Sequence, residues 1–110
     1  MSTALSTNQD DLMAIRDAIS QNRGGKEVIA RILEAYGFTT RIALCKQLGV
    51  SQSTMANRYA RDTFPADWVI VCHLETRASL IWLSTGKGSR FKDGRDDKTT
   101  LLKHIDITNG

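Results

Sequence analysis

Apolar side chains recur every three or four residues in five stretches of this 110-residue sequence, which is the spacing at which an α-helix returns to the same face. In the first and clearest stretch the apolar positions are Val28, Ile29, Ile32, Leu33 and Tyr36. Glycine follows the first, second and fifth stretches, where helices commonly end in a left-handed residue. The pattern therefore predicts helices over residues 26–36, 40–48, 52–61, 65–75 and 79–85.

A shorter helix is predicted before these five, with one apolar stripe formed by Leu12, Ile15, Ala18 and Ile19. Thr7 is the predicted N-cap of this helix, and Asp10 three residues later completes a variant of the capping box. The glycine pair at 24–25 then predicts a flexible hinge, because glycine loses the most conformational freedom on folding. We expect residues 1–23 to form an accessory helix with its hinge, and residues 24–88 to form the main domain.

The stretch from 65 is rich in β-branched residues, and residues 69–71 alone are also compatible with a strand. Pro65 at the expected first turn and the four-residue spacing of Trp68 and Cys72 favour a helix. Trp68 and Trp82 each lie within an apolar helical stripe, so both are expected in the core rather than on a stacking surface.

Periodicity stops after Gly88, and residues 89–110 are predicted to be a linker followed by the start of a further, missing domain. The last apolar positions, Leu101, Leu102, Ile105 and Ile107, are too few to fold alone. The predicted class is all-α, with a five-helix domain, an extra N-terminal helix and a flexible C-terminal linker.

Composition narrows the class of protein further. Eleven basic and five acidic residues lie in the segment 23–92, although the whole chain has a formal net charge of only +3. This uneven distribution is typical of a domain that binds a polyanion. Cys45 and Cys72 fall inside apolar helical patterns, which favours buried free thiols in a reducing cytoplasm. Neither a signal peptide nor a membrane-spanning apolar run is recognisable.

The second and third predicted helices are joined by a short turn that contains Gly49. Gly49 permits the left-handed backbone of a tight reversal, and Cys45, four residues earlier, is small enough for two helices to cross closely. Apolar residues on both sides of the turn are placed to bury the inside of the corner, namely Leu44, Leu48, Val50 and Met55. The combination predicts a helix-turn-helix motif.

The third predicted helix has an outward face made of polar or small residues, the kind that can enter the major groove of DNA. The candidate base-reading residues are Gln52, Ser53, Ala56 and Asn57. Gln or Asn can form paired hydrogen bonds with adenine, a hydroxyl can reach several bases, and a methyl group can touch thymine. The alternative is an ordinary solvated helix face, which we consider less favoured after this turn.

Phosphate contacts are predicted from both ends of the motif, by Thr40, Arg41, Arg58 and Arg61. Ser51 is the predicted N-cap of the third helix and Thr39 that of the second. Arg58 has an equally weighted alternative, in which its stem covers the core and its guanidinium pairs with Asp62. Arg23 and Lys26 are compatible with a minor-groove arm, although a charged hinge is the commoner arrangement.

Enzymatic function is not expected. His73 and His104 have no carboxylate or cysteine partners at ligand spacing, and the two cysteines form no metal motif, so neither a metal nor a cofactor is predicted. The run at 85–89 (Thr-Gly-Lys-Gly-Ser) lacks the first glycine of a phosphate-binding loop and follows a helix instead of a strand. It is interpreted as a helix stop.

Three stretches together resemble the N-terminal domain of temperate-phage CI-type repressors: 49–59, which contains Asn-Arg-Tyr; 64–68; and 80–88, which ends in Trp-Leu-Ser-Thr-Gly-Lys-Gly. The resemblance covers about residues 24–88. It implies a lambda-repressor-like fold and dimeric binding to palindromic operators that maintain lysogeny, in the cytoplasm of a bacterial host at its nucleoid. By position it implies base reading by Gln52 and Ser53, a groove contact by Asn57 and a phosphate contact by Arg41.

The resemblance also implies a C-terminal oligomerisation domain, giving a homodimer or higher oligomer in a full-length protein. Induction by self-cleavage would require such a domain. A separate antirepressor protein that contacts helix faces outside the groove is therefore a candidate partner for induction. The alternative function is an antitoxin-like interaction module that uses the same fold to hold a partner protein.

Overall fold

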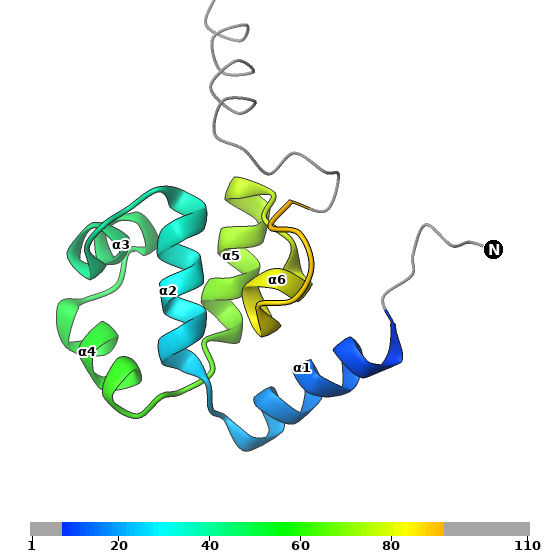
Figure 1. Ribbon diagram of the computed structural model, residues 1–110. Helices are drawn as coiled ribbons and strands as arrows, with labels where there is room; N and C mark the ends of the chain where they lie inside the picture. The colour runs from blue at the N-terminus through cyan, green and yellow to red at the C-terminus, as the bar shows by residue number, and fades with distance from the viewer. Residues whose placement is uncertain (1–7, 92–110) are drawn as a thin grey trace, which may run out of the picture.

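The computed structural model describes residues 8–91, which form helices and the turns between them (Figure 1). An isolated antiparallel bridge between Ala78 and Phe91 is the only β-type pairing in this range. The helices are α1 (Gln9–Gln21), α2 (Gly25–Tyr36), α3 (Arg41–Leu48), α4 (Gln52–Ala60), α5 (Ala66–Thr76) and α6 (Leu80–Thr85). The predicted all-α class is therefore confirmed, and the β-branched segment 69–71 is helical.

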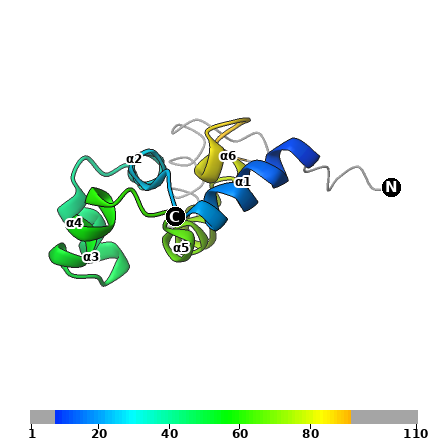
Figure 2. The ribbon, with the colours of Figure 1, turned by 90° about the horizontal axis from the view of Figure 1, so that it is seen from below.

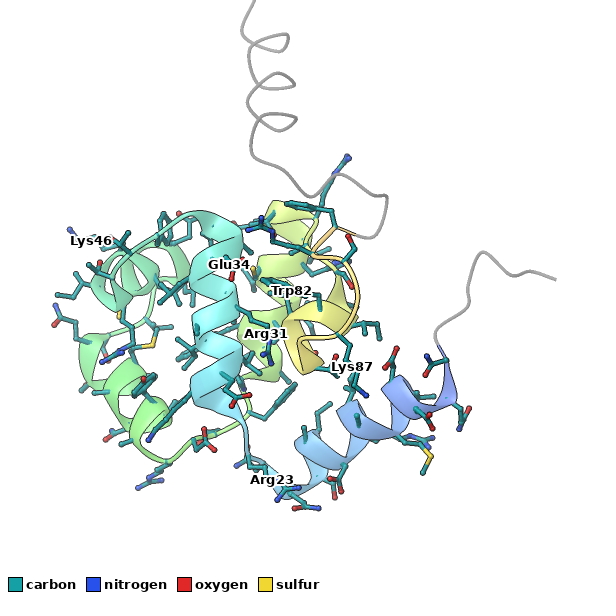
Figure 3. The ribbon with its side chains drawn as sticks, in the orientation of Figure 1. Arg23, Arg31, Glu34, Lys46, Trp82 and Lys87 are labelled. Carbon is teal, nitrogen blue, oxygen red and sulfur yellow. The ribbon has the colours of Figure 1, made fainter. Side chains whose placement is uncertain are left out.

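Helix α2 is central, because it packs against α4 on one side and against α5 and α6 on the other (Figures 1 and 2). Its buried face joins apolar side chains from each neighbouring helix in one core. The buried residues of this core include Ile29, Ile32, Leu44, Met55, Trp68, Cys72 and Leu83. Both cysteines are buried free thiols, as predicted, and Trp82 packs against this core while remaining half-buried. Arg31 of α2 also donates from Nε to the Leu83 carbonyl oxygen at 2.9 Å, close to Trp82 (Figure 3).

Two predicted N-caps are wrong by one residue. Helix α1 is capped by Asn8 instead of Thr7, since Asn8 Oδ1 accepts a hydrogen bond from the Asp11 N–H at 2.8 Å. Helix α3 is capped by Thr40 instead of Thr39, and Thr40 Oγ1 accepts from the Ala43 N–H at 3.1 Å. In both cases the capping residue has an extended backbone three positions before the donor, which is the geometry a cap requires. The Ser51 cap of α4 is confirmed.

The glycine pair between α1 and α2 is closely packed and hydrogen-bonded, in contrast to the predicted flexible hinge. The Asp62 carboxylate accepts from the Gly24 N–H at 3.1 Å and from the Lys26 N–H at 2.9 Å, while the Asp62 carbonyl accepts from the Gly25 N–H at 3.0 Å. A Cβ on Gly25 would lie 1.9 Å from the Thr63 carbonyl oxygen. Gly25 therefore allows close contact with the α4–α5 loop, and Asp62 accepts hydrogen bonds from N–H groups that the start of a helix leaves unpaired.

The Asp62 clamp predicts a specific acid sensitivity. Hydrogen bonds from the Lys26 and Gly24 N–H groups lower the pKa of Asp62, so its stabilising effect is present above the carboxyl's unfolded pKa, near 4, and is lost as the pH falls through the lowered folded value. The parent should therefore unfold at higher denaturant than Asp62→Asn at pH 7, with the difference shrinking below about pH 4. Denaturant titrations across this range measure it, and a difference that does not change with pH would contradict the clamp.

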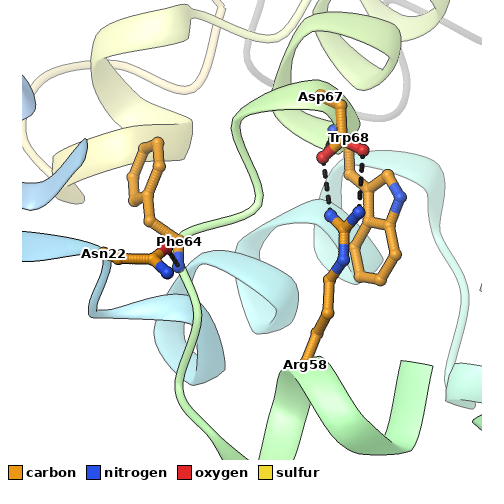
Figure 4. A network of polar contacts seen from close by, with 5 residues as sticks. All are labelled: Asn22, Arg58, Phe64, Asp67 and Trp68. Atoms are coloured by element: carbon orange, nitrogen blue, oxygen red, sulfur yellow. Dashed lines mark hydrogen bonds and ion pairs between the residues drawn. The ribbon is translucent and has the colours of Figure 1, made fainter. Parts of the chain in front are cut away.

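Helix α1 packs on α6, at the opposite end of the molecule from α3 and α4 (Figures 1 and 2). Its side chains remain at least partly exposed, but Ala18 contacts the core and Lys87 Nζ lies 3.9 Å from the Asp11 carboxylate. At its C-terminal end, Asn22 Oδ1 accepts from the Phe64 N–H at 3.2 Å (Figure 4). The accessory helix is thus tied to the rest of the fold at both ends.

The folded part extends further than the predicted boundary at 88. Phe91 is 2% exposed, and the Ser79 N–H donates to the Arg90 carbonyl oxygen at 2.6 Å. The Arg90 guanidinium lies 3.3 Å from the Glu34 carboxylate of α2. A single apolar residue in a polar run has no periodicity, so the pattern could not reveal this contact. The remainder of the predicted linker, with the apolar positions from 101 onward, lies outside the described residues.

The outer face of α5 carries exposed aliphatic side chains. Ile70 is 54% exposed, Val71 37% and Leu74 73%, with Asp67 at one end of this stripe and Arg77 at the other. Within residues 8–91, no helix combines the length and apolar character needed to cross a membrane.

Candidate nucleic-acid interface

Helices α3 and α4 form the predicted helix-turn-helix corner. Gly49 ends α3 with a left-handed φ of +71°, and the Val50 N–H then donates to the Cys45 carbonyl oxygen at 3.0 Å. Cys45 Sγ lies 3.9 Å from the Ser51 carbonyl oxygen, so the small side chain sits directly beneath the turn. Leu44 and Met55 are buried beneath the corner, which fixes the angle at which α4 leaves it.

The four candidate base-reading side chains all lie on the exposed face of α4. This face comprises Gln52, Ser53, Ala56 and Asn57, and it continues into Ala60 and Arg61. The opposite side of the helix faces the core through Met55, which is 2% exposed. Ser53 Oγ lies 3.1 Å from Ser51 Oγ, so the hydroxyls at the start of α4 are ordered by one another. The orientation needed for groove reading is present, while the base contacts themselves stay a prediction.

A hollow of about 430 Å³ lies between the start of α3 and the adjacent edge of α4. It is lined by residues of both helices of the motif and of the turn before α3: Thr39, Thr40, Arg41, Ile42, Cys45, Gln52, Met55 and Ala56. The N-terminus of α3 opens onto it, and a helix N-terminus favours negative charge. Thr40 and Arg41, both predicted phosphate contacts, thus lie beside Gln52, a predicted base contact.

Arg41 is held against an aromatic ring. Its guanidinium carbon lies 3.9 Å from the centroid of Tyr59, and Lys26 Nζ of α2 lies 5.6 Å from the same centroid. Arg41 and Lys26 are exposed, whereas Tyr59 is half-buried. Helical spacing predicts that Tyr59 lies on the inward side of α4. It could not predict the contacts with Arg41 and Lys26, because these join three separate helices.

Arg58 pairs with Asp67, not with Asp62 as one of the two alternatives proposed (Figure 4). Its two terminal nitrogens donate to the two Asp67 carboxylate oxygens at 2.7 and 3.1 Å, and its guanidinium lies 4.4 Å from the centroid of Trp68. This ion pair is the main cause of a lowered Asp67 pKa. Asp62 is unavailable because its carboxylate caps the start of α2. The other part of that alternative, in which the aliphatic stem of Arg58 covers the core, agrees with the stacking of Arg58 on Trp68.

Arg61 is the most open of the four predicted phosphate contacts. It is exposed at the C-cap of α4, and its N–H donates to the Asn57 carbonyl oxygen at 3.1 Å. Between residues 8 and 91, Arg61 takes part in no ion pair, in contrast to Arg58. Arg41 and Arg61 are therefore both exposed beside α4, whereas Arg58 is turned toward α5.

A polar contact that residue spacing did not reveal holds the motif against α5. Glu75 Oε1 accepts hydrogen bonds from the Tyr36 hydroxyl at 2.5 Å and from Gln47 Nε2 at 3.1 Å. Burial and the Glu75 carboxylate raise the pKa of Tyr36, and the same hydrogen bonds lower the pKa of Glu75. Glu75 thereby links α2, α3 and α5. It holds the C-terminal end of α3, which is the end distant from the hollow.

Of the two histidines considered for chemistry, His73 lies within the described residues and His104 lies outside them. His73 Nδ1 lies 2.7 Å from the Ala78 carbonyl oxygen, and Gly86 ends α6 with φ +81°, which is the predicted helix stop. In the part of the chain that the structure describes, histidine, cysteine and acidic side chains form no group of three or more suited to a metal ion.

The corner, the exposed polar face of α4 and the basic groups around it define a helix-turn-helix domain of the DNA-binding class. Residues 27–91 match the family described as "Bacteriophage CI repressor helix-turn-helix domain". Since the match covers more than half of the sequence, the chain belongs to this family, which is one of DNA-binding domains rather than enzymes. The predicted CI-type resemblance and lambda-repressor-like fold are confirmed.

The chain is also similar to three curated proteins, of which two are named repressor protein CI. The chain is 66% identical over 70 residues to the protein ORFi in retron Ec67 of Escherichia coli, an alignment that covers 64% of this chain and 35% of that protein. It is 41% identical over 70 residues to the repressor protein CI of Escherichia phage 186, covering 64% and 36%. It is 46% identical over 74 residues to the repressor protein CI of Haemophilus phage HP1, covering 67% and 38%. The alignments thus span little more than a third of each relative.

Proposed function

We propose that this chain is the operator-binding part of a transcriptional repressor that reads a palindromic double-stranded DNA site through the major groove. The observation that carries the proposal is the outward stripe of amide, hydroxyl and methyl groups on α4, held by the Gly49 corner. Two relatives are named repressor protein CI and come from phages, which supports a role in maintaining lysogeny.

The reading face divides into base and backbone contacts. Gln52 and Ser53, on the first turn of α4, are placed to reach base edges, with Ala56 and Asn57 one turn further on. Thr40 and Arg41 lie beside this face at the hollow, and Arg61 is the exposed C-cap of α4. Arg58 would contact a phosphate only by exchanging Asp67 for it, so we rank it below the other three.

The proposal is tested by selecting duplexes from a random pool with the purified chain. The selected sequence should contain two inverted half-sites one helical turn or a multiple of it apart, because a palindrome reflects the two-fold symmetry of a protein dimer. It should bind more tightly than a scrambled duplex of equal length at the same salt concentration, since specificity has meaning only at fixed ionic strength. Recovery of unrelated sequences with equal affinity would refute sequence-specific binding.

Dimeric binding is supported by the outer face of α5. Its aliphatic centre, Ile70 and Leu74, is exposed, and a second copy related by a two-fold axis would bury it against the same side chains. Release from the operator by an antirepressor protein would in turn use faces outside the groove, such as that of α1.

The Leu74→Glu substitution should abolish cooperative occupancy of two half-sites while leaving binding to one half-site unchanged. A carboxylate at a side chain that is 73% exposed costs little in the monomer but cannot be buried against a second copy. Gel-shift titrations on duplexes with one and two half-sites measure this, with Met13→Glu on α1 as the matched control at another exposed apolar position. Unchanged cooperativity in Leu74→Glu would exclude this face of α5.

A further inference from the structure

The aromatic ring of Tyr59 gathers two cations from different helices. Arg41 is the first residue of α3 and Lys26 the second residue of α2, and their charged groups lie 3.9 and 5.6 Å from the ring centroid. Each contact is in the range of a cation–π interaction, which the ring can make on its face. Three helices therefore contribute to this contact, and both cationic side chains are exposed.

This cluster lacks an anion of its own. Within residues 8–91, Lys26 and Arg41 form no ion pair. The Asp62 carboxylate interacts electrostatically with Lys26, but it already accepts hydrogen bonds from the Gly24 and Lys26 N–H groups. An anion bound beside both cations would be attracted by each of them.

The cluster lies along one edge of the reading face. Tyr59 is seven residues, or close to two helical turns, after Gln52, so both residues border the same side of α4. Between them, the hollow lined by Arg41, Gln52 and Ala56 follows that edge. A helix that enters the major groove has a phosphodiester strand along each edge, which makes a backbone phosphate the anion that this position would meet.

We propose that Lys26 and Arg41, held on the ring of Tyr59, form a two-cation subsite for a single phosphodiester group of the DNA strand flanking α4. Tyr59 is a positioning residue in this subsite, since it orders the cations and does not itself need to touch the phosphate. The proposal rests on the proposed function and extends it to Lys26 and Tyr59.

The salt dependence of DNA binding tests the subsite, because each phosphate neutralised contributes about one unit to the slope of log affinity against log salt. Lys26→Ala, Arg41→Ala and Tyr59→Leu should each lower this slope by up to about one unit on a selected duplex and on a duplex of unrelated sequence alike. Tyr59→Phe, which keeps the ring face, should retain the parent slope. In the Lys26→Ala/Arg41→Ala background, Tyr59→Leu should change the slope no further.

Lys87→Ala is the matched control, because it removes one positive charge at the opposite end of the molecule, next to α1 (Figure 3). It should leave the slope unchanged. Thermal unfolding followed by circular dichroism identifies any variant that has lost its fold. If Tyr59→Leu is such a variant, Lys26→Ala still tests the subsite, because its side chain is exposed and its removal leaves the core intact.

Each result separates the two proposals. A parent that discriminates between duplexes, with a slope that Lys26→Ala and Tyr59→Leu leave unchanged, overturns the subsite and keeps the proposed function. A parent that binds all duplexes alike, with a slope that these variants lower, keeps the subsite and overturns sequence-specific reading. A parent that binds no duplex overturns both.

Discussion

Gln52→Ala should weaken binding to the selected operator by about 1–3 kcal/mol and relax the base preference at one position of each half-site. Gln52 is exposed on the first turn of α4 and borders the hollow where the backbone is expected. Its amide can donate and accept at one base edge at once, and the truncated variant leaves that edge unpaired inside the interface. Fluorescence anisotropy on a set of operators mutated at each position measures both effects.

Gln9→Ala is the matched control for this experiment, since it truncates the same exposed side chain on α1, away from α3 and α4 (Figure 2). It should bind the operator like the parent. The salt slope should be the same in the parent and in Gln52→Ala, because a base contact releases no counterions. If Gln52→Ala binds every operator variant as the parent does, Gln52 does not read bases.

Phe91→Ala should lower the free energy of unfolding by about 3–5 kcal/mol, a large part of the roughly 5–15 kcal/mol typical of a small domain. Phe91 is 2% exposed and is one of the largest buried side chains. Its truncation leaves a cavity in the core. It also removes the side chain that anchors one partner of the Ala78–Phe91 bridge, which attaches the segment after α6. Urea denaturation followed by circular dichroism measures the change.

Met13→Ala is the control for apolar truncation, because Met13 is 55% exposed on α1. It should change the unfolding free energy by less than about 0.5 kcal/mol. A Phe91→Ala protein as stable as this control would place Phe91 outside the core in solution, and would restore the domain boundary at 88 that periodicity predicts.

The helix-turn-helix corner could be predicted from sequence because its determinants are local. Gly49, Cys45 and Met55 lie within eleven residues of one another, and each acts through backbone conformation or side-chain size at the turn itself. The outward face of α4 follows from the same spacing, since helical periodicity alone assigns Asn57 and Met55 to opposite sides of the helix. The helix ends at 37, 49 and 86 follow from glycine.

Contacts between distant segments could not be predicted in this way. Asp62 and Asp67 both follow Arg58 in the sequence, and residue spacing favours pairing with Asp62, which is four residues away. In the structure, however, the Asp62 carboxylate accepts hydrogen bonds from backbone N–H groups at the start of α2, and Arg58 pairs with Asp67. The segment predicted as a flexible hinge is hydrogen-bonded instead, because Asp62 accepts from its backbone N–H groups. Each outcome depends on competition among partners that only the folded chain brings together.

The amino-acid order alone thus determined the all-helical class, the corner and the residues that α4 turns outward, because backbone preference and helical period act over a few residues. Tertiary structure decided which charged side chains are available to a ligand: Arg58 pairs with Asp67, while Lys26 and Arg41 lie over the ring of Tyr59. It also decided that Phe91 is buried in the core. Pairing and burial are properties of distance in space, and separation along the chain does not set that distance.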